Sequence, residues 1–180
     1  RRVHSRPGAQ AVIMAGVDPG FSGAIAVLYC PPAGSGRPQI KALWDMPVVS
    51  KTVGKKYILD DLLNQVRAVS AFDPVKFLVE DVSGRGHQKG SSTFGYGVGL
   101  LHMAATAAHL PLEIVRPDTW KPHLRCPAEK RGATKLAASL IEGGDKRFYG
   151  PKGGVLDCRA EACLLAYWGW TKASRIGRAR

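Results

Sequence analysis

Four acidic residues lie where strands or helices are expected to begin or end. Asp18 and Glu80 each close an apolar run, and Asp157 and Glu161 stand four residues apart at the start of a segment with helical spacing. That separation places the last two on one helical face. Carboxylates within about 5 Å of one another repel by several kcal/mol per pair at an effective dielectric of about 20. Such a cluster is stable only if it shares a proton or a cation.

The chemistry of these side chains indicates which cation. Oxygen ligands without His or paired Cys favour Mg²⁺ or Mn²⁺ over Zn²⁺. Two such ions about 4 Å apart can stabilise both the attacking and the leaving oxygen of an in-line attack on a phosphodiester. We therefore expect two Mg²⁺ ions in one site, with Mn²⁺ able to substitute.

Each acid also has a local explanation. Asp18 precedes a Pro-Gly pair and can simply form a turn. Either Glu80 or Asp81 can be the ligand; we favour Glu80 because it closes the apolar strand and faces a glycine-rich loop. Asp157 can cap the helix that follows it, and Glu161 can pair with a neighbouring arginine or with solvent. The conjunction of the four favours a metal site.

The hydrophobic pattern predicts a single α/β domain. Strands are expected over residues 12–18, 24–30, 40–46, 75–82 and 112–115. Helices are expected over residues 59–69, 94–110, 133–141 and 157–168, with Asp118 as an N-cap before a short turn. Residues 47–57, 83–92 and 143–154 are expected to be loops. The order βββ-α-β-α-β-α-α predicts a mixed five-stranded sheet flanked by helices.

Charge and composition restrict the function classes. The chain has 180 residues, 26 basic against 14 acidic, and a net charge of +12, which points to a polyanionic partner such as nucleic acid. Seven of the basic residues lie in two tails, 1–10 and 171–180, so residues 11–170 form the expected domain with a smaller excess. A 45% hydrophobic content excludes global disorder. No apolar run approaches the roughly 20 residues of a membrane span, so we expect no membrane partner.

The four cysteines are far apart and form no CxxC pair, which favours a reducing compartment over a disulfide framework. A zinc site would have to use His123, Cys126, Cys158 and Cys163. The last two are five residues apart on an expected helix and point in different directions, which argues against zinc.

Five segments in order resemble a known family. They are 16–24 (GVDPGFSGA), 79–80 (VE), 93–97 (TFGYG), 120–121 (WK) and 157–162 (DCRAEA). This pattern is similar to that of the RuvC-like Holliday junction resolvases, and within them to the plant and algal chloroplast type, with phage resolvases as relatives. The four-residue step from Asp157 to Glu161 departs from bacterial RuvC proteins, which usually close with two aspartates three residues apart.

The resemblance implies a ribonuclease H-like fold and a function in DNA recombination and repair. It makes Asp18, Glu80, Asp157 and Glu161 the metal-binding acids of a two-metal endonuclease, with Lys121 near the scissile phosphate. It also implies a homodimer that resolves four-way DNA junctions by paired symmetric nicks. The chloroplast nucleoid is the expected location in a plant or alga, where the basic start resembles a trimmed transit peptide; otherwise it is the cytoplasm of a phage-infected bacterium.

Branched DNA offers many phosphates, so basic loops near the acids are the expected contacts. The candidates are Lys51, Lys55, Lys56, Arg85, His87, Gln88, Lys89, Lys130, Arg131 and Lys135. Phe94 and Tyr96 can stack on an unpaired base or pack in the core. The small-residue face from Gly97 to Ala108 can form the dimer interface or pack on the sheet.

Three other functions fit parts of the sequence. An RNA–DNA hybrid nuclease would use the same acids, and a non-catalytic junction-binding protein would use the same basic surface. The DPGFSG segment also resembles the phosphate hairpin of actin-like ATPases, but those folds need a second such half, for which 180 residues are too few. We therefore expect no nucleotide cofactor.

Overall fold

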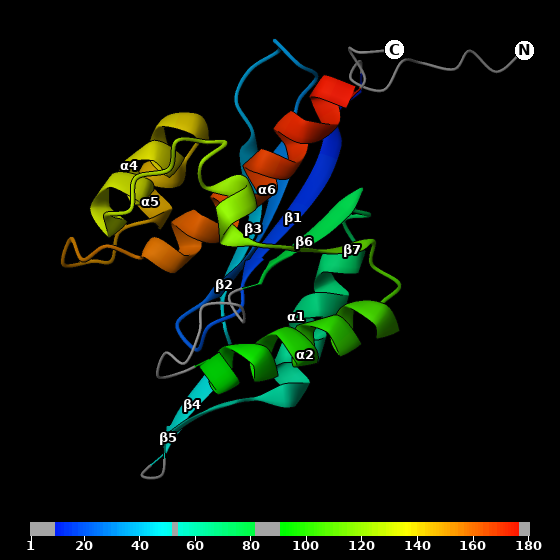
Figure 1. Ribbon diagram of the computed structural model, residues 1–180, viewed down its shortest axis with the longest axis vertical. Coiled ribbons are helices and arrows are strands. Elements are labelled where there is room, and N and C mark those ends of the chain that lie inside the picture. Colours follow the sequence, from blue (N-terminus) through cyan, green and yellow to red (C-terminus); the bar gives the residue numbers. More distant parts are fainter. Residues whose placement is uncertain (1–9, 52–53, 82–90, 177–180) are drawn as a thin grey trace, which may run out of the picture.

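The computed structural model describes residues 10–51, 54–81 and 91–176 and contains a mixed five-stranded sheet (Figure 1). The strand order is β3-β2-β1-β6-β7. These strands are β1 (Val12–Asp18), β2 (Ala24–Cys30), β3 (Gln39–Asp45), β6 (Lys76–Glu80) and β7 (Leu112–Val115). The first three are antiparallel neighbours, whereas β6 runs parallel to β1 and β7 parallel to β6. The predicted sheet is confirmed.

Helices cover both faces of the sheet. One face carries α6 (Asp157–Ile176), α4 (Lys130–Leu140) and the short α5 (Gly144–Arg147); the other carries α1 (Leu59–Ser70) and α2 (Ser91–Ala107). Met14 packs with the α6 side, while its neighbours Ala15 and Val17 pack with the α1 and α2 side. Because alternate side chains enter two different cores, the central strands are apolar along their length.

Helix α6 packs directly on the backbone of β1. A Cβ added at Gly16 would overlap the carbonyl oxygen of Ala162 and lie 2.7 Å from the backbone nitrogen of Ala166. The alanines at 160, 162 and 166 are fully buried, which allows the close approach. The first turns of α6, which hold two of the predicted acids, are therefore held beside the end of β1.

Several sequence predictions are corrected. Residues 47–57, expected to be a loop, contain an antiparallel hairpin of β4 (Val48–Lys51) and β5 (Gly54–Tyr57). Its first and last residues, Val48 and Tyr57, pack on the core under α1 and α2. This packing stabilises the strand pairing, which the lysine-rich sequence did not predict. The expected loop 143–154 contains α5, which is followed by the fully buried Phe148.

Helix boundaries also differ from those expected. Helix α2 ends before His109, whose φ of 53° lies in the left-handed region. Helix α4 begins three residues earlier than predicted. Helix α6 continues past Trp168 to Ile176: no Pro interrupts it, and Gly169 lies within it, packed against Leu78. Asp118 is not an N-cap: it lies inside α3 (Pro117–Trp120), and its carboxylate pairs with Arg116 at 2.8 Å.

The small-residue face of α2 packs mainly inward. Leu101 and Ala105 are buried in the core, and Gly97 is enclosed by Tyr57 and Pro19. The alternative in which this face packs on the sheet is therefore correct for these positions. Among the helices in the described ranges, none is long and apolar enough to cross a membrane.

We predict that Gly16→Ala destabilises the protein, because the added methyl group meets backbone atoms of α6 that cannot move independently. The expected loss is about 1–3 kcal/mol in the free energy of unfolding, measured by urea denaturation. Gly99→Ala is the matched control, since nothing lies within 4 Å of its added Cβ. It should be neutral or stabilising by up to about 1 kcal/mol. Equal effects of the two changes would contradict close packing of α6 on β1.

Candidate active site

Strands β1 and β6 bring the first two acids to the same edge of the sheet. The strands are parallel neighbours, with Val17 opposite Val79, so Asp18 and Glu80 follow at adjacent carboxyl ends. Helix α6 begins at this edge and adds Asp157 and Glu161 from its first turns. Its start is anchored by Arg159, whose guanidinium forms two 2.6 Å hydrogen bonds with the carboxylate of Asp45 at the end of β3.

Glu80 is buried, with 5% of its surface exposed. Its Oε1 accepts a 3.0 Å hydrogen bond from Nε1 of Trp120, which is itself fully buried, and lies 3.5 Å from Nζ of Lys121. Burial raises the pKa of Glu80 to about 7, with Lys121 opposing the shift and Glu161 and Asp18 adding to it. Trp120 therefore holds Glu80 through this hydrogen bond, and Glu80 is the member of the Glu80–Asp81 pair that faces Lys121.

Lys121 lies between two acids. Its Nζ is 2.6 Å from Oε2 of Glu161 and 3.5 Å from Oε1 of Glu80. Burial opposes the charge of the amine, but these two carboxylates outweigh it and raise the pKa of Lys121. The lysine is therefore charged at neutral pH and acts as the counter-ion of the buried Glu80.

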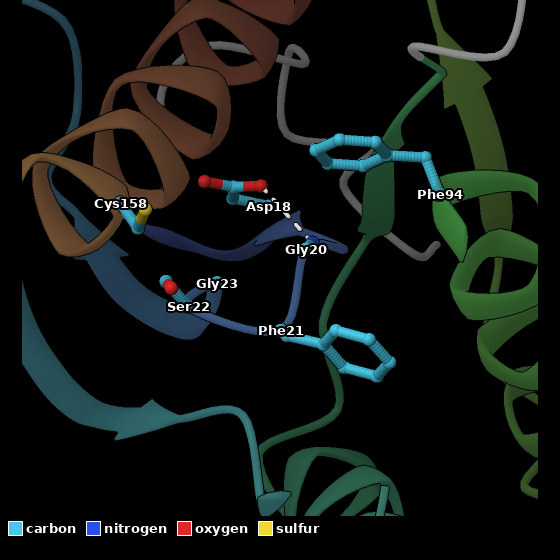
Figure 2. A pocket seen from close by; sticks show the side chains of 7 residues that line it. All are labelled: Asp18, Gly20, Phe21, Ser22, Gly23, Phe94 and Cys158. Atoms are coloured by element: carbon cyan, nitrogen blue, oxygen red, sulfur yellow. Dashed lines mark hydrogen bonds between the residues drawn. The ribbon is translucent and has the colours of Figure 1, made fainter. Parts of the chain in front are cut away.

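Asp18 is partly buried on the other side of the site. Its Oδ1 accepts a 3.3 Å hydrogen bond from the backbone N–H of Gly20, and Figure 2 shows Cys158 of α6 beside it. Burial raises the pKa of Asp18; hydrogen bonds from Cys158 and Gly20 oppose this, and the charge of Glu161 adds to it. Asp18, Glu80 and Glu161 thus lie within electrostatic reach of one another.

Asp157 has its own counter-ion. Nζ of Lys130, at the start of α4, lies 2.7 Å from Oδ2 of Asp157. This contact brings one predicted DNA-binding lysine beside the acids. Glu161, by contrast, pairs with Lys121 and not with Arg159, which is committed to Asp45.

A cavity of about 340 Å³ opens beside Asp18 (Figure 2). Its lining residues are Gly20, Phe21, Ser22, Gly23, Phe94 and Cys158, together with Asp18. Phe94 therefore lines the cavity beside Asp18. Tyr96, at 52% exposure, points outward and contacts Tyr57, with ring centroids 6.0 Å apart.

The other predicted DNA contacts that the structure describes come from both sides of the sheet. Arg131 and Lys135 are exposed on α4, on the α6 side of the sheet, and Lys55 and Lys56 are exposed on β5, on the α1 and α2 side. Arg85, His87, Gln88 and Lys89 lie outside the described residues, as does the side chain of Lys51.

Comparison with solved structures places this arrangement in a known fold. RuvC of Thermus thermophilus, solved in complex with a Holliday junction substrate, matches 92% of this chain and 97% of its own, with a TM-score of 0.67 and 16% identity. A second Thermus thermophilus RuvC structure matches with a TM-score of 0.59 and 15% identity, covering 90% of this chain and 97% of its own. The chain has a ribonuclease H-like fold.

The yeast mitochondrial Holliday junction resolvase Ydc2 matches 92% of this chain and 80% of its own, with a TM-score of 0.55 and 16% identity. No family model and no curated protein matches the chain by sequence. The ribonuclease H-like fold is thus shown by the backbone, at identities too low to carry function by themselves.

The donor set of this ribonuclease H-like site fits a hard divalent cation, since it consists of carboxylates that raise one another's pKa. Within the described ranges, however, no three His, Cys, Asp or Glu side chains are close enough to hold a metal as they stand. Lys121 separates Glu80 from Glu161, and Lys130 holds Asp157. Metal would have to replace these ion pairs.

Sequence reasoning missed three supporting residues. Cys158 contacts Asp18, and Tyr57 contacts Pro19, the residue after it. Asp45 anchors the start of α6 through Arg159. Cys158 lies within the DCRAEA segment, which was the available signal for it. Neither Asp45 nor Tyr57 carries any spacing pattern that relates it to the acids.

We predict that the metal-free protein loses stability as pH rises from about 5 to about 7, because Glu80 has a pKa of about 7 when folded and an ordinary value of 4.5. Between these two pKa values the folded state binds the proton of Glu80 more tightly than the unfolded state does. The stabilisation that this proton gives is therefore lost as the pH rises through the folded pKa. The difference corresponds to about 3 kcal/mol.

Glu80→Gln should flatten this dependence in chemical denaturation followed across pH in EDTA. Glu113→Gln is the control, since Lys76 lowers the pKa of Glu113, so its contribution is lost at acidic pH instead. A slope between pH 5 and 7 that survives Glu80→Gln would show that other groups cause it.

Proposed function

We propose that this protein is a metal-dependent endodeoxyribonuclease that resolves four-way DNA junctions by paired symmetric nicks. The observation that carries the proposal is the convergence of Asp18, Glu80 and Glu161 on Lys121, from three distant parts of the chain. Both RuvC and Ydc2, whose folds resemble this one, are Holliday junction resolvases by name or by bound substrate. The five sequence segments that resemble this family contain all of the converging acids and Lys121.

Asp18, Glu80, Asp157 and Glu161 would hold two Mg²⁺ ions. When bound, the ions would supply an activated water nucleophile and charge stabilisation at the leaving oxygen. Trp120 keeps the carboxylate of Glu80 oriented through its 3.0 Å hydrogen bond, and Gly20 does the same for Asp18 at 3.3 Å. These contacts hold the ligands in place before any ion arrives.

Lys121 has two roles in this scheme. Without metal its ammonium balances Glu80 and Glu161. If metal ions neutralised these carboxylates, the ammonium would be free to contact an oxygen of the scissile phosphate. A preorganised cation at that point stabilises the charge that develops in the transition state.

The DNA would lie across the edge that holds the acids. Lys130, Arg131 and Lys135 would contact phosphates on one side of it, and Lys51, Lys55 and Lys56 on the other. Phe94 borders the cavity beside Asp18, where it can stack on a base unpaired at the crossover. The same phosphate-binding role is proposed, from the sequence alone, for Arg85, His87, Gln88 and Lys89.

A homodimer would match the two-fold symmetry of a four-way junction. An apolar groove of about 260 Å³ between α1 and α2 is the proposed interface, lined by Leu59, Leu62, Leu63, Leu100, Met103, Ala104 and Ala107. Met103 is 69% exposed and Leu59 51%, values that a second copy would reduce.

We assign the protein to the chloroplast nucleoid or to a phage-infected bacterium on the resemblance alone.

We predict that Asp18→Asn or Asp157→Asn abolishes Mg²⁺-dependent nicking of a fixed four-way junction, by a hundredfold or more, because each removes a charged metal ligand. Binding to the same junction in Ca²⁺ should persist. Asp118→Asn is the matched control, as this exposed aspartate pairs only with Arg116 among the contacts described for it. It should cleave like the wild type.

The substrate arms of this assay separate the related functions. The wild type should make symmetric nicks in the junction and leave linear duplex and RNA–DNA hybrid uncut at equal concentration. Preference for the hybrid would replace this proposal with a hybrid nuclease, and binding without any cleavage would replace it with a junction-binding protein.

We predict that Met103→Asp converts a dimer to a monomer in analytical ultracentrifugation, because the new charge would be buried in an apolar interface. Nicks should then become unpaired. Val75→Asp is the control, since Val75 is 46% exposed and does not line the groove. A dimer that tolerates Met103→Asp would place the interface elsewhere.

A further inference from the structure

A buried tyrosine links three segments beside Asp18. Tyr57 is the last residue of β5 and is 7% exposed. Its hydroxyl donates a hydrogen bond to the carbonyl oxygen of Pro19, the buried residue that follows Asp18. The end of the lysine-rich hairpin is thus bonded to the backbone from which the acid projects.

The ring of Tyr57 is enclosed from two directions. Phe21 of the β1–β2 turn lies 4.8 Å away between centroids, and Tyr96 of α2 lies 6.0 Å away. A Cβ added at Gly97 would overlap the Tyr57 hydroxyl and lie 2.6 Å from the Pro19 oxygen. The second glycine of the FGYG segment is therefore required by this hydrogen bond and not by the local conformation of α2.

The hydroxyl makes a contact that a purely apolar ring would lack. A phenylalanine would fill the same volume, but a buried phenol requires a partner, and here that partner is the Pro19 carbonyl. Burial, with the charges of Asp18 and Tyr96, raises the pKa of Tyr57 to about 12. The hydroxyl therefore remains a donor throughout the neutral range, within electrostatic reach of Asp18.

We propose that Tyr57 is a positioning residue for Asp18, acting through the Pro19 carbonyl. The hydroxyl fixes the backbone immediately after the acid, so the carboxylate is held where metal and phosphate must meet. Because Tyr57 directly follows Lys55 and Lys56, it also joins a proposed DNA-binding hairpin to the catalytic edge. This inference rests on the proposed nuclease function and adds a residue that no sequence motif contains.

Displacements of about 1 Å at a reacting group can cost about a hundredfold in rate. Loss of one hydrogen bond that only restrains the turn should cost less, and we expect about tenfold. The test is Tyr57→Phe, which removes the hydroxyl and keeps the ring. Tyr29→Phe, on β2 and away from the acids, is the matched control.

Three quantities are measured for each variant. The first is the single-turnover rate of junction cleavage at saturating enzyme in Mg²⁺, and the second is the Kd for the junction in Ca²⁺. The third is the Mn²⁺ affinity of the protein alone, from the electron paramagnetic resonance signal of free Mn²⁺. Tyr57→Phe should lower the rate about tenfold and weaken Mn²⁺ binding severalfold. Its Kd for the junction should stay within twofold of the wild type, and Tyr29→Phe should match the wild type in all three.

A second variant perturbs the same contact from the other side. Gly97→Ala should push the Tyr57 hydroxyl and the Pro19 carbonyl apart and reproduce the lower rate and weaker Mn²⁺ binding. Gly99→Ala, whose added Cβ meets nothing within 4 Å, should not. Thermal melting of each variant verifies that it is folded at the assay temperature.

The outcomes separate this inference from the proposed function. If Tyr57→Phe cleaves and binds Mn²⁺ like the wild type, the tyrosine only packs and the inference is wrong. If Tyr57→Phe weakens junction binding as much as it lowers the rate, Tyr57 stabilises the DNA-binding hairpin and does not position Asp18. That result would also overturn the inference. If the wild type binds Mn²⁺ but does not cut junctions, the nuclease proposal fails, while the Mn²⁺ comparison still decides the role of Tyr57. If the wild type does neither, both fail.

Discussion

Repulsion among carboxylates at one edge of the sheet is the constraint that organises this molecule. Glu80 is buried, Asp18 partly so, and Glu161 raises the pKa of both, so the folded protein must supply positive charge there. Lys121 and Lys130 supply it, at 2.6 Å from Glu161 and 2.7 Å from Asp157. In the proposed function, metal ions would take over the charge balance that the two lysines provide without metal.

The rest of the fold explains how the repelling carboxylates are held together at this edge of the sheet. Two cores, one on each face, hold β1 and β6 in register, and the contact of α6 with Gly16 fixes the helix that carries two of the acids. Arg159 ties the start of that helix to Asp45. The free energy of this packing offsets the cost of gathering like charges, which is the usual relation between a stable scaffold and a polar site.

The supporting contacts come from segments that recognise DNA in the proposed function. Tyr57 belongs to the hairpin with Lys55 and Lys56, and Lys130 begins α4. In that proposal, Lys55 and Lys56 precede the tyrosine that bonds to the Pro19 carbonyl, and Lys130 itself pairs with Asp157.

The amino-acid sequence alone determined the sheet, the helices on its faces and the positions of the four acids, because apolar periodicity and charge at strand ends are local signals. It could not reveal the β4–β5 hairpin, whose pairing is stabilised by burial of Val48 and Tyr57 under distant helices. It favoured Glu80 over Asp81 without deciding between them, and only the tertiary structure showed Glu80 directed toward Trp120 and Lys121. Such choices depend on contacts between residues far apart in the chain, such as Tyr57 with Pro19, and those exist only once the layers have packed.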